Sequence, residues 1–193
     1  MEILTPHDAL IIADIQNDFL PDGALGIRGG DEIIPVLLHY VRRFHSRGLP
    51  IFLTRDWHPP NHCSFREQGG QWPVHCVAGT HGSLPPPTFD APTSAVIIYK
   101  AVDPDREAYS AFQHTLLNRH LRALGIHRVF VGGLATDYCV LNTVKDAVGL
   151  GYAVCLLMDG IRAVNLRPDD GCLAEQEMIR LGARPTRLET FAA

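Results

Sequence analysis

The chain of 193 residues suits one compact α/β domain and leaves little room for a second. Hydrophobic residues make up 46% and charged residues 20%, as in ordinary globular proteins. The net charge of −4, without a stripe of Lys or Arg, argues against a nucleic-acid partner. The first residues do not resemble a signal peptide, and the apolar run 9–13 is far too short to span a bilayer. We therefore expect a cytoplasmic protein without a membrane partner.

Short apolar runs alternate with helical patterns along most of the chain. Short continuous apolar runs suit strands that are buried on both faces. Strands are expected at 9–13, 50–54, 95–99, 128–132 and 153–158, with an edge strand at 185–188. Helices are expected at 31–47, where Asp31 would cap the first turn, and at 113–124, 137–150 and 171–181. This alternation predicts a single three-layer α/β/α domain over 1–193, with a mainly parallel sheet of about six strands and helices on both faces.

Residues 55–94 interrupt this rhythm with many prolines and glycines and four histidines. A connection of this length without periodicity is usually functional or disordered. Its aromatic and histidine content argues against disorder, so we expect a functional loop.

Chemically useful side chains follow four of the predicted strands. Asp14, Asp56 and Lys100 follow the first, second and third strands, and the glycine-rich segment 132–139 follows the fourth. Ligands bind beyond the carboxyl ends of the strands in open parallel sheets. An acid, a cation and the Cys139 thiol would therefore meet at one edge, which predicts a cysteine nucleophile.

Cys139 is one of five cysteines, none of them in a CxxC pair, and a reducing compartment would keep all five as free thiols. Its place near a helix N-terminus predicts a lowered thiol pKa and nearby N–H donors for an oxyanion. The alternative is a small buried apolar residue, an interpretation that we apply to Cys155 and Cys172. Asp14 and Lys100 could likewise form only a structural ion pair, but their convergence on a thiol favours a catalytic role.

Asp56 and His58, with His75 further along, offer carboxylate and imidazole ligands on one loop. Such a set suits zinc, iron or manganese with positions left for water or substrate. Two questions stay open: whether His62 ligates the metal or only shapes the loop, and whether Glu67 holds a metal-bound water.

Four ordered segments resemble the nicotinamidases (pyrazinamidases) of the isochorismatase-like cysteine hydrolases. They are DIQNDF at 14–19, DWHPPNH at 56–62, WPVHC at 72–76 and GLATDYCV at 133–140. The likeness runs from the first predicted strand to at least Gly160. The resemblance implies one isochorismatase-like hydrolase domain over 1–193.

The resemblance also implies a role for each matching residue. The implied catalytic triad is Asp14, Lys100 and Cys139. The implied metal ligands are Asp56, His58 and His75. The implied oxyanion hole is the backbone N–H groups of Ala135 and Cys139, with a cis peptide bond before Ala135. The implied aromatic positions around the substrate ring are Phe19, Trp72 and Tyr109.

The implied activity is metal-dependent hydrolysis of nicotinamide to nicotinate and ammonia through a cysteine thioester, in NAD salvage. The implied cofactor is one divalent metal ion, zinc first, with iron or manganese as alternatives. The implied partner is a small molecule, nicotinamide and by extension pyrazinamide. The sequence leaves the oligomeric state open, a homo-oligomer included.

Two other hypotheses remain. Another amidase of the same superfamily would act on carbamoyl or ureido substrates, but such relatives generally lack the metal motif. A metal-binding or redox-sensing module would use Cys139 only as an oxidisable thiol and would need neither Asp14 nor Lys100.

Overall fold

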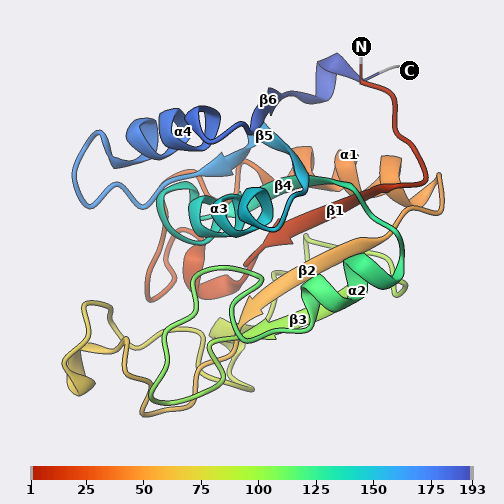
Figure 1. The fold of residues 1–193 in the computed structure, drawn as a ribbon. Helices are drawn as coiled ribbons and strands as arrows, with labels where there is room; N and C mark the ends of the chain where they lie inside the picture. Colours follow the sequence, from red (N-terminus) through yellow and green to blue (C-terminus); the bar gives the residue numbers. More distant parts are fainter. Residues whose placement is uncertain (1, 192–193) are drawn as a thin grey trace.

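The computed structural model describes residues 2–191, which form a six-stranded parallel sheet in the order β3-β2-β1-β4-β5-β6 (Figure 1). The strands are β1 (Asp8–Ala13), β2 (Ile51–Asp56), β3 (Val96–Lys100), β4 (Arg128–Leu134), β5 (Ala153–Arg162) and β6 (Arg184–Thr186). The predicted fold class is confirmed. All six residues of the central strand β1 are buried, as its unbroken apolar run indicates.

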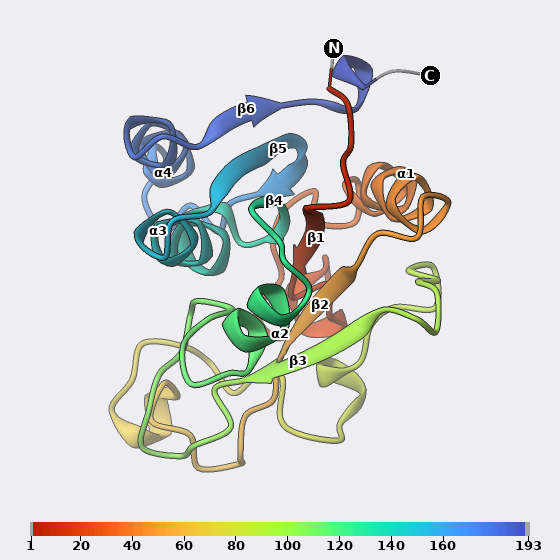
Figure 2. The ribbon, with the colours of Figure 1, turned by 45° about the vertical axis from the view of Figure 1, so that its right-hand side comes forward.

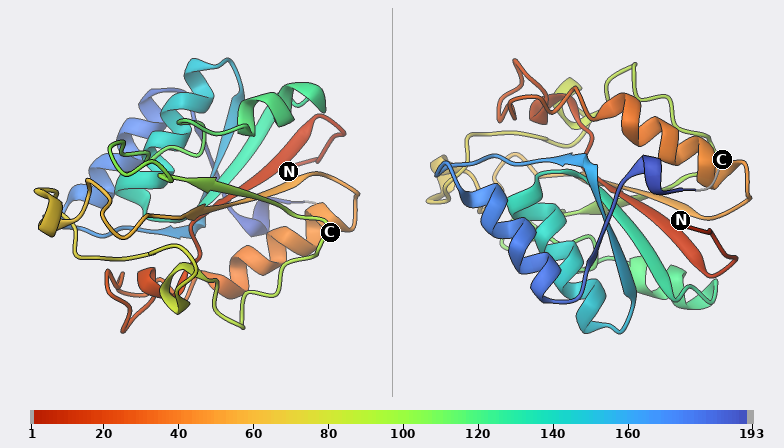
Figure 3. Two further views of the ribbon diagram at one scale, coloured as in Figure 1. Left: turned by 90° about the horizontal axis from the view of Figure 1, so that it is seen from below. Right: turned by 90° about the horizontal axis from the view of Figure 1, so that it is seen from above.

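Helices cover both faces of this sheet. They are α1 (Ile34–His45), α2 (Leu117–Ala123), α3 (Leu141–Gly149) and α4 (Asp170–Arg180). Helix α1 lies on one face, and the other three lie on the opposite face (Figures 2 and 3). Short 3-10 turns occur at Asn17–Phe19, Arg66–Gln68, His81–Ser83 and Leu188–Thr190, and a π-helical turn occurs at Thr136–Val140. No helix in this part of the chain is long and apolar enough to cross a membrane.

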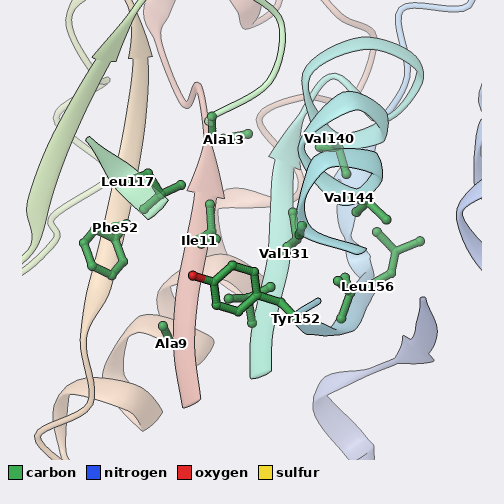
Figure 4. Packing of buried hydrophobic residues seen from close by; sticks show 14 of the residues in the cluster. Ala9, Ile11, Ala13, Phe52, Leu117, Val131, Val140, Val144, Tyr152 and Leu156 are labelled. Atoms are coloured by element: carbon green, nitrogen blue, oxygen red, sulfur yellow. The ribbon is translucent and has the colours of Figure 1, made fainter. Parts of the chain in front are cut away.

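Alternate residues of β1 divide the core into two layers. Ala9, Ile11 and Ala13 face α2 and α3, and Figure 4 shows them beside Val131 and Val144. Leu10 and Ile12 face the opposite layer, which α1 covers. Apolar burial of this kind contributes about 25 cal/mol per Å² of surface removed from water. The central strands are thereby held rigidly, which fixes the position of the groups at their ends.

The chain reverses its direction of strand addition between β1 and β4. Strands β2 and β3 are added on one side of β1, whereas β4, β5 and β6 extend the other side. Such a switch point leaves a crevice at the carboxyl ends of the two strands. Asp14 follows β1 there, and the π-helical turn Thr136–Val140 follows β4. The long loops after β2 and β3 gather at the same end of the sheet (Figure 1).

Several predicted boundaries are wrong by a few residues. Helix α1 begins at Ile34 with Pro35 in its first turn, and its N-cap is Ile33, so Asp31 is not the cap. Proline at this place needs no backbone N–H partner, which explains the start. Helix α2 begins four residues after the predicted 113, and β4 continues two residues beyond the predicted 132.

Candidate active site

Asp14 is placed by the end of β1 and is completely buried. Its backbone has a left-handed φ of 50°, an uncommon conformation for a residue with a side chain. The Thr54 hydroxyl of β2 donates a hydrogen bond of 2.6 Å to Asp14 Oδ1. The other oxygen, Oδ2, accepts no hydrogen bond within the described chain and lies 3.0 Å from the ammonium of Lys100. One carboxylate oxygen is therefore fixed and the other is available.

Lys100 is the last residue of the edge strand β3, and its ammonium is buried among acceptors. It pairs with Asp14 and Asp56, donates to the carbonyl of Ala108 at 3.2 Å and lies 3.4 Å from Cys139 Sγ. Burial alone would lower the pKa of Lys100, but the two carboxylates outweigh it and hold that pKa well above its usual value. Lys100 therefore stays charged.

Cys139 lies in the π-helical turn that leads into α3 and is buried. The expected lowering of its pKa is not what the structure gives. Burial raises the pKa of the Cys139 thiol well above its ordinary value, Lys100 opposes this, and Asp14 and Asp56 add to it. Desolvation at this depth outweighs the helix terminus, so the thiol needs a base to deprotonate it.

Charge balance identifies that base. Asp14, Asp56 and Cys139 offer ligand atoms within 4.8 Å of one another around one ammonium. Burial raises the pKa of Asp14 as well, although Lys100 opposes it. For Asp56, burial acts upward too, but Lys100 and the neighbouring His58 lower its pKa overall. Asp56 thus balances Lys100, and burial disfavours a second negative charge on either Asp14 or Cys139. Moving the thiol proton to Asp14 leaves the buried charge unchanged.

The predicted metal ligands come together as a second buried cluster beside this one. Asp56, His58 and His75 offer ligand atoms within 4.8 Å of one another. His75 Nδ1 lies 2.8 Å from the carbonyl of Pro73, and His58 Nδ1 lies 3.3 Å from that of Ala101. We assign the ring protons to these nitrogens, which directs each Nε2 lone pair inward. His58 Nε2 is buried without a hydrogen-bond partner among the described residues, as a metal-ligating nitrogen would be. The residues therefore fit a divalent metal.

His62 and Glu67 stand apart from this cluster. The His62 ring packs against that of His58, tilted by 34° with 4.2 Å between the ring centroids, but both of its nitrogens have other partners. Its Nδ1 accepts from Ser64 and its Nε2 lies 3.0 Å from the carbonyl of Arg106. Glu67 is exposed on the turn Arg66–Gln68. The geometry favours a loop-shaping role for His62.

Two residues of the first motif, which the sequence interpretation did not assign, hold the metal-ligand loop. The buried Gln16 amide donates to the carbonyls of Asp56 (2.8 Å) and Ser83 (2.9 Å), and Gln16 Oε1 accepts from Asp56 N–H at 2.9 Å. Asp18 Oδ2 accepts the N–H of Cys76, next to His75, at 2.7 Å. Both lie within five residues of the end of β1, in the same short polar segment as Asp14.

One pocket joins the thiol and the metal ligands. Its walls include Cys139, the three metal-ligand residues, Ala135 and the predicted aromatic residues Phe19, Trp72 and Tyr109. Sequence reasoning missed four further wall residues: Leu25, Glu107, Tyr138 and Val164. A wider hollow lies over β2 and β3, against residues 85–97, but neither cysteine nor histidine lines it. The chemistry is therefore in the smaller, predominantly apolar pocket.

Three aromatic rings from three separate segments, Trp72, Tyr109 and Tyr138, line this pocket and contact one another. Trp72 Nε1 donates to the Tyr109 hydroxyl at 2.9 Å, and the Trp72 ring packs edge-on against Tyr138 at 4.8 Å. Tyr109 and Tyr138 lie 5.4 Å apart. Tyr138 directly precedes the nucleophile, a position whose side chain direction depends on the π-helical turn and not on the sequence pattern.

The peptide bond between Leu134 and Ala135 is cis, as the resemblance implies. It ends β4 and turns the chain into the segment that carries Cys139. The carbonyl of Ala135 accepts from the N–H groups of Tyr138 and Val140, so it points into the turn. Ala135 and Cys139 thereby share one wall of the pocket.

Comparison with known proteins agrees with this geometry. The isochorismatase domain model matches residues 8–189. The chain belongs to the isochorismatase family. Among its relatives, the nicotinamidase of Escherichia coli (strain K12) is 38% identical over 199 residues, covering 92% of this chain and 93% of the relative.

Two solved structures of this family are also similar. The pyrazinamidase of Pyrococcus horikoshii in complex with zinc is 46% identical, with a TM-score of 0.91 over 95% of this chain and 100% of the other. PnC1 from L. infantum in complex with nicotinate is 33% identical, with a TM-score of 0.89 over 98% of each chain.

Proposed function

We propose that this chain hydrolyses nicotinamide to nicotinate and ammonia, a step of NAD salvage, and accepts pyrazinamide as a second substrate. The observation that carries the proposal is one pocket in which a buried Cys139–Lys100–Asp14 cluster adjoins the Asp56–His58–His75 cluster. The activities named for similar family members support it. We assign the catalytic function to one isochorismatase-like domain, acting in the cytoplasm, alone or as a homo-oligomer.

The pocket suits a flat pyridine carboxamide. Phe19, Trp72 and Tyr109 offer aromatic surface for the ring. Asp56, His58 and His75 would hold one divalent ion, for which we propose zinc first and iron or manganese as alternatives. When bound, that ion supplies a Lewis-acid anchor for a ring nitrogen.

In the first half-reaction, Asp14 accepts the thiol proton of Cys139, and the sulfur attacks the amide carbon. The backbone N–H groups of Ala135 and Cys139 stabilise the resulting oxyanion. Asp14 returns the proton to the amide nitrogen, the C–N bond breaks and ammonia leaves. A thioester to Cys139 remains.

In the second half-reaction, Asp14 removes a proton from water, and the hydroxide attacks the thioester carbon. The C–S bond breaks, the proton goes to the sulfur, and nicotinic acid leaves and releases its proton to solvent as nicotinate. Lys100 stays positively charged throughout and balances whichever of Asp14 and Cys139 is anionic.

Ammonia release from nicotinamide tests the proposal. Cys172 is exposed and not buried as the sequence predicted, so Cys172→Ser serves as the control. Wild type and Cys172→Ser should release ammonia equally, whereas Cys139→Ala should lose about 10³-fold or more of the rate. Thorough chelation should abolish turnover, and added zinc should restore it. Activity that survives Cys139→Ala would contradict the nucleophile, and indifference to metal removal would contradict the metal anchor. Cleavage of carbamoyl substrates alone would favour the alternative amidase.

A further inference from the structure

Asp137 lies two residues before the nucleophile and has no part in the chemistry above. Its carboxylate leaves its own turn and accepts two backbone hydrogen bonds from the loop after β5. The N–H of Val164 donates to Oδ1 and the N–H of Asn165 donates to Oδ2, both at 2.9 Å. Hydrogen bonds to a charged acceptor are roughly twice as strong as neutral ones.

The loop is shaped to receive this carboxylate. Successive N–H groups converge on one anion when the chain takes a left-handed residue, and Asn165 has a φ of 53°. Asn165 Oδ1 in turn accepts the N–H of Gly171, in the first turn of α4, at 2.8 Å. A Cβ at Gly171 would lie 2.6 Å from that of Ala163, so a larger residue does not fit there. The loop is thus fixed both to α4 and to the nucleophile turn.

Val164 transmits this arrangement to the pocket. Its half-buried side chain packs against the core cluster that contains Phe19 and Ala135, and it lines the same pocket as Cys139. We propose that Asp137 is a positioning residue, which sets the Val164 wall against the ring of an aromatic carboxamide. This inference rests on the proposed function. The alternative is a purely local role, in which Asp137 would hold only the turn that carries Cys139 and would not position Val164.

Hydrogen exchange tests the first step without any substrate. Asp137→Asn should accelerate amide exchange at Val164 and Asn165 about tenfold or more, because each N–H loses a charged acceptor. The matched control is Asp169→Asn, the same change on the same loop at an exposed carboxylate. It should leave both amides unchanged. Exchange in Asp137→Asn that equals wild type would overturn the proposal.

Kinetics on nicotinamide test the second step. Asp137→Asn and Val164→Ala should each raise KM about tenfold, with kcat within about threefold of wild type. In the double variant the KM should rise no further, because both changes remove the same wall. A fall in kcat without a change in KM, or fully multiplicative effects in the double variant, would overturn the proposal.

Alkylation of Cys139 by iodoacetamide distinguishes two roles for Asp137: positioning Val164 in the pocket wall, or holding the turn that carries Cys139. Followed by mass spectrometry of the Cys139 peptide, its rate in Asp137→Asn should stay within about twofold of wild type. A rate reduced by more than about tenfold would assign Asp137 to the turn alone. If Asp137→Asn does not fold, an unchanged KM in Val164→Ala still refutes the proposal that Val164 contacts the substrate ring. Wild type that releases no ammonia would refute the proposed function, whereas hydrogen exchange would still decide the Asp137 contact.

Discussion

The two ends of strand β1 carry an aspartate each, and the two aspartates have opposite surroundings. Asp8, at the amino end, accepts from Arg128 Nε at 2.7 Å and Nη2 at 2.5 Å. Glu2 pairs with both Arg128 and Arg184. Two carboxylates thus meet two guanidinium groups, and the arginines reach solvent. A matched and forked arrangement of this kind stabilises the fold.

Asp14, at the carboxyl end, has one ammonium that is shared with Asp56 and a thiol, all of them buried. One of its oxygens is left without a hydrogen bond among residues 2–191. Burial raises the pKa of Asp14 because the single cation does not offset the desolvation. Fully compensated charges, as at Asp8, stabilise the fold. A buried carboxylate whose charge is only partly compensated, as at Asp14, has a shifted pKa that suits it to proton transfer.

The largest expected effect is that of Asp14→Asn on catalysis. The variant should lose about 10³-fold or more of the nicotinamide turnover, because the amide cannot accept the thiol proton. Its melting temperature should not fall, since a poorly compensated buried charge is removed.

The pH dependence of this variant follows from the raised pKa of Asp14. Because the pKa of Asp14 is raised by folding, the protonated form binds its proton more tightly in the folded protein. Its contribution to the free energy of unfolding is therefore lost as the pH rises through the folded-state pKa. The melting temperature of Asp14→Asn, relative to wild type, should therefore increase with pH. A relative decrease would contradict the assigned pKa direction.

The corresponding change at the other end of β1 is Asp8→Asn, which should affect stability more than catalysis. We expect the free energy of unfolding to fall by about 2 kcal/mol, because Arg128 loses a two-pronged charged acceptor. Urea unfolding measures this, with the exposed Asp22→Asn as the control. Turnover of the folded protein should remain near wild type, and a catalytic defect of the Asp14 kind would abolish the contrast between the two ends.

A smaller effect is expected for Thr54→Val, which preserves shape but removes the hydrogen bond to Asp14 Oδ1. The kcat for nicotinamide should fall about tenfold, because the base is no longer oriented. Thr54→Ser retains the hydroxyl and should recover most of the rate. Equal losses in both variants would point to packing instead of the hydrogen bond.

The smallest effect is expected for Glu67→Gln. Glu67 is exposed and lies outside the cluster of metal-ligand atoms, so both bound metal and turnover should be unchanged. His75→Ala, by contrast, should lose the metal. Metal content measured by inductively coupled plasma mass spectrometry distinguishes the two, and a loss in Glu67→Gln would bring this residue back to the metal site.

Much of the fold could be predicted because burial imposes continuous apolar runs on parallel strands. The run 9–13 and the polar residue that follows it place Asp14 correctly at the sheet edge. The far end of β5 was missed, because the strand runs ten residues and passes through Asp159 and Gly160, which interrupt the apolar pattern. Its pairing with β4 continues only after a register shift, a tertiary feature without a local signal.

The sequence predicts those parts of the site in which motif residues themselves react or bind. It does not predict properties that depend on the three-dimensional packing, such as burial depth and the make-up of the pocket wall. Asp14 follows β1, and Asp56 and Lys100 are the last residues of β2 and β3, so all three converge at the carboxyl ends of the strands. The raised pKa of Cys139 depends on burial depth, which the spacing of residues does not contain. Val164 belongs to no motif, and its place in the pocket wall depends on a loop held from another part of the chain.

Lys100 lies at the end of β3, one of the two edge strands of the sheet, and among residues 2–191 this strand pairs with β2 alone. Edge strands open locally at a lower free energy than central strands do. A brief separation of β3 would withdraw the only ammonium from the triad while the remaining sheet stays intact. Gentle heating should therefore inactivate the enzyme reversibly below its melting temperature. The highest temperature at which it is active would then be set by the local opening of the edge strand β3.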